Sequence, residues 1–366
     1  MFGHYRQFEG MTEQEVSADL RAKADERKQQ ALARVEPLDL SATTWPEYPP
    51  STVVNAITYA ARRGLHRYLD RHATALRSEL SHALGVAEER LVVGDGAAQL
   101  LGAAAQALLE PLDELVTPWP SYGLYPVIAH RARGHAVPVP GFGAQAVLRA
   151  VNERTRIVAL CNPNDPTGEL VAAGELRSLL DALPDRVIVL LDEALRDFVD
   201  AEERDAALAL VDEFPRLLVF RTFSKAWGLA GLRVGYAIGG PGAEALLEQL
   251  EPELGLNELA QAGALEALRH AGAVVADRTA MVAAERIRLT AAARDLGLHV
   301  TPSQANVLWL RAEQIDGGEL TRRLERHGVI VAPGGPLGDG ACVRASVQRP
   351  EAGDRLLRAL GLSGAA

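Results

Sequence analysis

Cysteine is scarce in this chain, and its scarcity excludes several kinds of site. Only two cysteines, Cys161 and Cys342, occur among the 366 residues. Neither lies in a Cys-x-x-Cys pair or beside clustered histidines, so the sequence does not indicate a cysteine-based metal or redox centre. Because free cysteine behaves as a small apolar residue, we expect both side chains to be buried.

Long hydrophobic runs and an excess of positive charge are also missing. No apolar stretch approaches the roughly 20 residues that a membrane-spanning helix requires. The N-terminus lacks the basic start and apolar core of a secretory signal, so we predict a cytoplasmic protein with no membrane partner. The formal net charge of −10 opposes general nucleic-acid binding, which needs basic groups to neutralise phosphates. Small molecules are the expected partners.

The central part of the chain alternates short apolar runs with helical patterns. Continuous Val, Ile and Leu runs flanked by turn residues are typical of strands that are buried on both faces. Such runs lie at residues 91–93, 135–139, 156–160, 187–191, 217–220 and 234–238. The pattern predicts an α/β fold with a mainly parallel central sheet, and its catalytic groups should lie in loops after the carboxyl ends of the strands.

The two ends of the chain have sequence patterns that differ from that of the central part. Good helix formers predict a polar helix over residues 13–35, and the prolines that follow predict an extended arm. After residue 241 a helical region precedes short strands, which indicates a smaller α+β domain with antiparallel strands. The predicted division is residues 1–64 for the N-terminal helix and arm, which form part of the small domain, 65–245 for the large domain and 246–366 for the small C-terminal domain.

Lys225 and Arg233 belong to the densest group of chemically useful residues, RTFSKAWGLAGLRVGY at 221–236. A lysine held at the active edge of a sheet can form a Schiff base, and the planar fork of an arginine suits a phosphate. A lysine in a loop is usually solvated, so the neighbouring motifs must support this interpretation.

Three other segments provide that support. Asp192 ends a run of five apolar residues, where a buried carboxylate needs a cationic partner, either a protonated pyridine nitrogen or a basic side chain. The segment GDGAAQL at 94–100 follows a strand and opens a helix whose N–H groups can receive a phosphate. Tyr122, in PWPSYGLY, either stacks on a planar cofactor or simply packs.

The ordered series GDGAAQL, PWPSYGLYP, CNPNDPTG, LLDEA, RTFSKAWGLAGLRVGY, PSQANVL and VRAS resembles a known family. It is similar to the class I and II (fold type I) aminotransferases, which depend on pyridoxal 5′-phosphate (PLP), and most of all to their histidinol-phosphate aminotransferase-like branch. The resemblance covers the chain from about Tyr68 onward. It implies a fold type I transferase whose large domain binds PLP.

The resemblance also implies a role for each matched residue. Lys225 looks like the Schiff-base lysine, Asp192 like the partner of the pyridine nitrogen, and Tyr122 like the aromatic stacked on the ring. The other implied cofactor-binding groups are the side chains of Ser224 and Arg233, the backbone at Ala97 and Ala98, position Asp165, and Tyr68 of a neighbouring subunit. Sharing of Tyr68 implies a homodimer. Arg344 resembles the arginine that pairs with the substrate α-carboxylate, for which bidentate binding suits arginine.

The activity implied by the resemblance is transfer of an amino group between an L-amino acid, or a histidinol-phosphate-like amine, and a 2-oxo acid. One alternative is another PLP-dependent reaction on the same fold, catalysed by a decarboxylase, lyase or amino-acid oxidase. A second alternative is a non-catalytic cofactor-binding protein. The presence of Lys225, Asp192, Arg233 and Arg344 opposes the second alternative.

Two positions depart from the family pattern near the phenolic oxygen of the cofactor. Asp165 stands directly before Pro-Thr-Gly where the family has asparagine, and Leu195 stands where the family has tyrosine. Loss of both donors should destabilise the phenolate and favour a protonated Schiff base, unless Asp165 is itself protonated. The alternative is that Asn162, Asn164 or a water donates instead.

Overall fold

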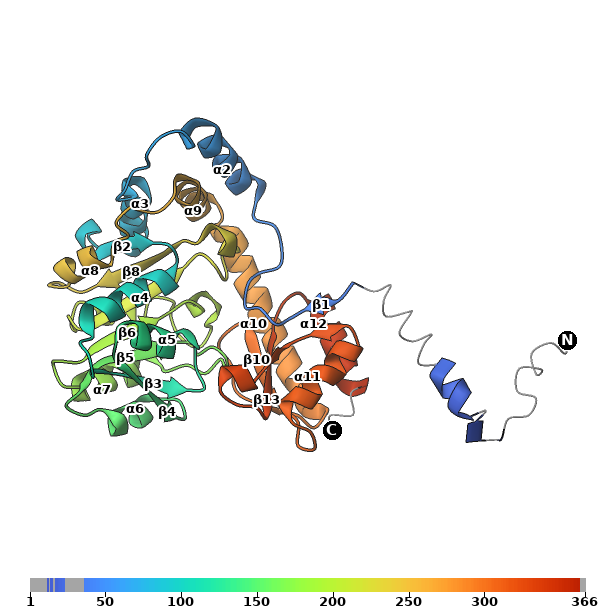
Figure 1. The fold of residues 1–366 in the computed structure, drawn as a ribbon. Helices are drawn as coiled ribbons and strands as arrows, with labels where there is room; N and C mark the ends of the chain where they lie inside the picture. The colour runs from blue at the N-terminus through green and yellow to red at the C-terminus, as the bar shows by residue number, and fades with distance from the viewer. Residues whose placement is uncertain (1–11, 13, 16, 24–35, 363–366) are drawn as a thin grey trace.

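A seven-stranded sheet forms the centre of the fold in the computed structural model, which describes residues 12, 14–15, 17–23 and 36–362 (Figure 1). The strand order is β2-β8-β7-β6-β5-β3-β4. In chain order the strands are β2 (Leu91–Gly94), β3 (Glu114–Trp119), β4 (His135–Pro140), β5 (Thr155–Cys161), β6 (Ile188–Asp192), β7 (Leu217–Thr222) and β8 (Gly235–Gly239). From β7 to β4 all neighbours pair in parallel, whereas β8 is antiparallel to both β2 and β7. The predicted mainly parallel α/β sheet is confirmed.

Apolar side chains cover both faces of this sheet. Along β5, Val158 and Leu160 belong to one hydrophobic cluster, and Ile157 and Ala159 belong to another. Because successive side chains of a strand point to opposite faces, one cluster lies on each face. All four side chains are fully buried, which explains why the strands read as continuous apolar runs in the sequence.

Helices form the layers on both sides of the sheet. One cluster contains side chains of α3 (Thr74–Leu84), α6 (Ala144–Ala150) and α7 (Ala173–Ala182). The other contains side chains of α4 (Ala97–Leu108), α5 (Leu124–Arg131) and α8 (Glu244–Leu250). The helix that GDGAAQL was predicted to open is α4, which begins at Ala97 directly after β2.

A second sheet lies in the C-terminal part, with the order β12-β13-β10-β9 and antiparallel pairing throughout. Its strands are β9 (His299–Val300), β10 (Val307–Arg311), β12 (Ala332–Pro333) and β13 (Cys342–Ser346). The helices of this part are α9 (Glu258–His270), α10 (Gly272–Asp295), α11 (Gly317–Arg326) and α12 (Pro350–Leu362). The single strand expected at 329–332 is instead two short strands, because β11 (Val329–Ile330) pairs with β1 (Leu38–Asp39) while β12 pairs with β13. The division of the chain at residues 64 and 245 stays a prediction.

The arm crosses from the second sheet toward the central one. Residues 41–50 form neither helix nor strand, and α2 (Ser51–Gly64) follows and packs against α9 (Figure 1). The expected arm extended past Pro50, but the helix begins there because proline is tolerated just before a first helical turn. Of the helix predicted over 13–35, residues 14–15 and 17–23 are helical, and the other positions lie outside the described residues.

The cysteines and the helices bear on two expectations from the composition. Cys161 and Cys342 are both buried free thiols, as predicted. In the described part of the chain, no helix combines the length and the apolar character needed to cross a membrane.

Candidate active site

The motifs singled out in the sequence meet at one edge of the central sheet. Strands β3, β5, β6 and β7 are parallel, so their carboxyl ends lie at the same edge. Strand β2 runs in the same direction, because β2 and β7 are both antiparallel to β8. Cys161 pairs with Asp192 across β5 and β6, and Asp192 pairs with Phe220 on β7. This edge is where α/β folds bind their ligands.

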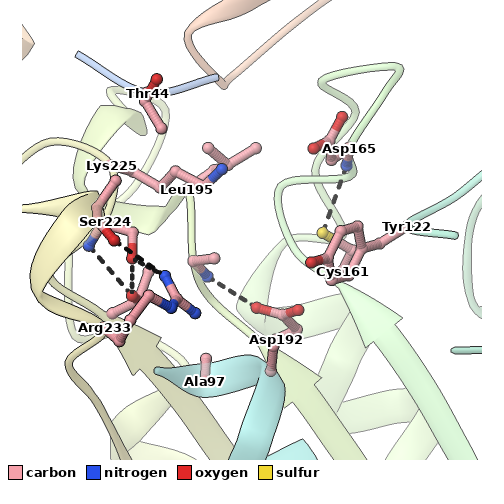
Figure 2. A pocket seen from close by; sticks show the side chains of 14 residues that line it. Thr44, Ala97, Tyr122, Cys161, Asp165, Asp192, Leu195, Ser224, Lys225 and Arg233 are labelled. Carbon is pink, nitrogen blue, oxygen red and sulfur yellow. Dashed lines mark hydrogen bonds between the residues drawn. The ribbon is translucent and has the colours of Figure 1, made fainter. Parts of the chain in front are cut away.

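A pocket with about 630 Å³ of empty space opens at this edge (Figure 2). Figure 2 shows Lys225, Ser224 and Arg233 on one side, Tyr122 and Asp165 on the other. Eight of the ten predicted site residues line the pocket, namely Ala97, Ala98, Tyr122, Asp165, Asp192, Ser224, Lys225 and Arg233. Leu195, which replaces a family tyrosine, also lines the pocket. The remaining lining residues had no role assigned from the sequence, namely Thr44, Cys161, Ala194, Thr222 and Ala230.

Lys225 enters the pocket from the loop after β7. Backbone hydrogen bonds brace this loop, from Gly228 N–H to the Lys225 carbonyl at 3.0 Å and from Leu229 N–H to the Phe223 carbonyl at 2.9 Å. The Nζ atom donates to the hydroxyl of Thr43 in the arm. Burial lowers the pKa of Lys225, because a charged ammonium loses its hydration there. A larger share of neutral amine makes this lysine a better nucleophile.

Asp192 ends β6 with a carboxylate that is buried and has no basic partner. Its oxygens accept hydrogen bonds from the Ala194 N–H at 3.0 Å and from the Tyr125 hydroxyl at 3.1 Å. Among the described residues it forms no ion pair, although the charge of Lys225 in the same pocket acts to lower its pKa. Burial raises the pKa of Asp192 to about 6, although the two hydrogen bonds oppose the shift. The site therefore holds a carboxylate suited to a buried cation.

A cradle for an anion lies at the start of α4. Gly96 precedes the helix with φ of +83° and ψ of 159°, a conformation that is essentially restricted to glycine. The first N–H groups of a helix lack partners within it and attract anions. Arg233 lies beside this turn and donates to Ser224 Oγ at 3.4 Å and to the Ala230 carbonyl at 3.1 Å.

Gly96 is required by the cradle in a second way. A Cβ atom added at Gly96 would lie 2.5 Å from Nη2 of Arg233, so the side chain would enter the space that the anion needs. We expect Gly96→Ala to weaken PLP binding to the apoprotein about tenfold, equivalent to roughly 1.4 kcal/mol. Fluorescence titration with PLP measures this change. Gly174→Ala is the control, because a Cβ atom there meets nothing within 4 Å; equal loss in both variants would contradict the prediction.

Tyr122 forms a wall of the pocket and leads to a residue that sequence reasoning missed. Its ring is 37% exposed and meets the edge of the Tyr125 ring, with centroids 5.8 Å apart and planes at 87°. Tyr125 is fully buried and donates to Asp192. PWPSYGLY contains both tyrosines, but Tyr122 lies before α5 and only Tyr125 lies within the helix, so helical spacing in the sequence did not reveal their contact.

Arg344 lies behind the pocket and forms an ion pair with Asp165, which lines the pocket. From β13 its Nη1 donates to the Asp165 carboxylate, and its Nη2 donates to the Ser41 carbonyl at 2.6 Å. Its Nε is buried and has no partner among the described residues. Both side chains are nearly buried, with Asp165 8% and Arg344 9% exposed. The two positions that the sequence analysis treated separately thus form one ion pair.

The asparagines considered as substitute donors are already engaged. Asn162 exchanges two hydrogen bonds of 2.8 Å with the backbone of Val171. Asn164 accepts from Ser121 at 2.7 Å and donates to Thr167 at 2.9 Å. Both brace the loop after β5 and neither lines the pocket, so the structure does not place them as substitutes for the missing phenolate donors.

Tyr68 is the predicted site residue that lies away from the pocket. It follows α2 in a turn, and its side chain is fully exposed. In a single chain it therefore contacts none of the pocket residues, and its predicted contact with a neighbouring subunit stays a prediction.

A buried ion network behind the site was not anticipated. Glu193, next to Asp192, accepts from Arg221 of β7 at 2.8 Å, and Arg221 also donates to Asp205 at 2.6 Å. The adjacent carboxylates raise the pKa of Arg221. Burying charges is unfavourable unless they are paired, so this network holds the ends of β6 and β7 in one arrangement. The spacing of Asp192 and Lys225 depends on those two ends.

The charges left without partners match the two ends of PLP. Asp192 presents an anion at the floor of the pocket, and Arg233 presents a cation, with no ion pair to either in the described part of the chain. The ring nitrogen of PLP is cationic when protonated and its phosphate is anionic, and Lys225 lines the same pocket as the two charged groups (Figure 2). The residues present therefore fit this cofactor.

Comparisons with known proteins agree with this geometry. The profile of the family described as "Aminotransferase class I and II" matches residues 35–360. A histidinol-phosphate aminotransferase of Nitrosococcus oceani is 37% identical over 88% of this chain and 87% of its own. An aromatic amino acid aminotransferase of Corynebacterium efficiens is 37% identical over 85% of this chain and 89% of its own. The structure of histidinol-phosphate aminotransferase from Sinorhizobium meliloti in complex with PLP superposes with a TM-score of 0.81, at 27% identity, over 93% of this chain and 94% of that one.

Proposed function

Since the chain belongs to the class I and II aminotransferases, we propose that it moves an amino group between an aromatic L-amino acid, or a histidinol-phosphate-like amine, and a 2-oxo acid. We further propose that Lys225 forms the Schiff base with PLP. The observation that carries this proposal is that one pocket is lined by the Lys225 side chain, a buried carboxylate with no ion pair and an arginine with no ion pair among the described residues. The relatives named for aromatic amino acids and for histidinol phosphate support these two donor classes.

Each side chain then has a distinct task. When bound, PLP supplies an electron sink for the electrons released at the substrate Cα. Lys225, whose pKa is lowered by burial, would take the proton from Cα as a general base and deliver it to C4′ of the cofactor as a general acid. Asp192 holds the proton on the ring nitrogen, and Tyr122 covers one face of the ring. Ser224, Arg233 and the N–H groups at Ala97 and Ala98 bind the phosphate.

Arg344 is assigned to the substrate. Its guanidinium is held at the rear of the pocket by Ser41, and arginine binds carboxylates through two parallel hydrogen bonds. Arg344 thus recognises the α-carboxylate of the amino acid or the 2-oxo acid. The ion pair with Asp165 must open when this carboxylate binds.

A homodimer completes the proposal. Tyr68 is fully exposed, and Tyr59 and Leu65 nearby are also exposed, at 61% and 75%. Exposed large apolar groups gathered on one segment are typical of an interface. We infer that Tyr68 reaches the phosphate in the pocket of the second subunit.

The amino-transfer proposal is tested by running each half of the reaction separately. The holoenzyme is incubated with ¹⁵N-labelled donors, including L-phenylalanine, L-tyrosine and histidinol phosphate, without an acceptor. We expect about one equivalent of oxo product per subunit with a true donor, as in a ping-pong mechanism. After removal of the donor, 2-oxoglutarate should yield ¹⁵N-glutamate. Release of carbon dioxide or consumption of oxygen, with no ¹⁵N-glutamate, would instead support a decarboxylase or an oxidase.

A further inference from the structure

The ion pair between Asp165 and Arg344 joins a wall of the pocket to the proposed substrate arginine. The two residues are 179 positions apart in sequence, and one lies in the loop after β5 while the other lies in β13. Arg344 Nη1 donates to Asp165 and Nη2 to the Ser41 carbonyl, while Nε has no partner among the described residues. A carboxylate of the protein itself therefore already binds the group proposed to receive a substrate carboxylate.

The loop that carries Asp165 is firmly held. The Asn164 N–H donates to the Glu169 carbonyl at 2.8 Å, and the Gly168 N–H donates to the Asn164 carbonyl at 2.7 Å. The Asp165 N–H also donates to Cys161 Sγ at 3.4 Å. Because the backbone is fixed on both sides, opening of the ion pair requires rotation of the Asp165 side chain, and its carboxylate stays near Arg344.

The electrostatic consequence depends on the charge of the ligand. The pair has no net charge, so Arg344 attracts an arriving carboxylate less strongly than an unpaired guanidinium would. The displaced Asp165 carboxylate would then lie beside a second carboxylate, and like charges at short range repel strongly when nearly buried. A ligand with a hydroxymethyl group in place of the carboxylate leaves the pair intact and avoids both effects.

We propose that Asp165 determines specificity by competing with the substrate carboxylate for Arg344, so that the site disfavours α-carboxylates relative to amines that lack one, such as amino alcohols. This inference rests on the role proposed for Arg344 in substrate binding. It applies equally to the 2-oxo acid, whose carboxylate must displace Asp165 in the same way. Asparagine at position 165, as in the resembling family, would leave Arg344 without this competitor.

The test measures binding of two ligands that differ only at the carboxylate. Wild-type and Asp165→Asn holoenzymes are titrated by calorimetry with 3-phenylpropanoate and with 3-phenylpropan-1-ol. We expect Asp165→Asn to lower the Kd of the propanoate about tenfold, as expected for release of a charge-assisted bond. The Kd of the alcohol should change less than about twofold, within the usual effect of a remote change.

Two further variants separate competition from other effects. Glu169→Gln removes one negative charge from the same loop without a contact to Arg344, and it should leave the ratio of the two Kd values unchanged. In an Arg344→Gln background, Asp165→Asn should no longer change this ratio. Thermal unfolding of each variant verifies that it is folded.

The outcomes either support or overturn the inference. A fall in the propanoate Kd that depends on Arg344 supports it. An unchanged ratio, an equal effect of Glu169→Gln, or weaker propanoate binding in Asp165→Asn overturns it, and the last result would mean that Asp165 orients Arg344 for its ligand. These measurements need no amino transfer, so an Asp165-dependent ratio in a protein that transfers no nitrogen would retain this inference and refute the proposed function.

Discussion

Replacement of Lys225 with alanine is expected to lower the rate of amino transfer by about 10⁴-fold or more, since one side chain supplies both the covalent attachment and the proton transfer. Lys225 lines the pocket together with Asp192 and Asp165. The ¹⁵N transfer assay with 2-oxoglutarate measures the loss. Lys23→Ala is the control, because Lys23 pairs with Asp19 in the N-terminal helix and should retain wild-type activity.

The covalent role of Lys225 has a separate and direct readout. The sequence contains only three lysines, Lys23, Lys28 and Lys225, so a Schiff base trapped with borohydride can be mapped without ambiguity. We expect the cofactor adduct on the peptide that contains Lys225, and no adduct in the Lys225→Ala variant. An adduct on Lys23 or Lys28 instead, or a Lys225→Ala variant that still transfers nitrogen at the wild-type rate, would refute the assignment.

The central sheet was predictable because burial on both faces leaves a simple mark in the sequence. A strand such as β6, with its run of apolar residues ending at Asp192, needs no alternation of polar and apolar positions. Once strands are parallel, their carboxyl ends must meet, so Asp192 and the loop with Lys225 could be placed at one edge. The pairing of β5, β6 and β7 agrees with that reasoning.

Contacts between distant segments could not be predicted in this way. Thr43 accepts from Lys225 across 182 positions, and Arg344 meets Asp165 across 179. Neither contact can be predicted from local periodicity, because the arm and β13 reach the pocket only through the packing of the whole chain. The helix α2 was missed for a different reason, since the prolines of the arm obscured a helix that starts directly after Pro50.

The unusual residues at positions 165 and 195 show the limit of a motif comparison. The sequence showed that both donors to the phenolic oxygen were replaced, and it left open whether Asn162 or Asn164 took their place. The structure shows both asparagines bonded elsewhere, and it shows Leu195 buried against the pocket. Asp165 faces an arginine, a contact that no local motif contains.

Replacement of Asp192 with asparagine is expected to have opposite effects on activity and on the stability of the apoprotein. Activity should fall by about 10²–10³-fold, because a neutral amide cannot hold the proton on the ring nitrogen. Stability should rise at neutral pH, because the wild-type carboxylate is buried without a cation and its pKa is raised to about 6. The Ala194 N–H can still donate to the amide oxygen, and the Tyr125 hydroxyl can accept from the amide NH2 that replaces the second carboxylate oxygen.

The sign of the pH dependence follows from the direction of the pKa shift. The pKa of Asp192 is raised from 3.8 to about 6 in the folded protein, so between these values the folded state binds more protons than the unfolded state. The contribution of Asp192 to the free energy of unfolding is fully present below pH 3.8 and is lost as the pH rises through 6. The loss is on the order of 3 kcal/mol above pH 6. Asparagine has no such dependence, so the variant should be more stable at pH 8 and nearly equal to wild type at pH 4.

Urea unfolding of the apoprotein at pH 4, 6 and 8 measures this difference. Asp95→Asn is the control, because Asp95 is exposed and its replacement should change stability by less than about 0.5 kcal/mol at every pH. Equal stability of wild type and Asp192→Asn at all three pH values would contradict the prediction. Because a cationic ring nitrogen compensates the carboxylate, PLP should stabilise the wild type more than the variant. The instability of Asp192 in the apoprotein and its affinity for the cofactor thus have the same cause, a buried negative charge without a protein cation.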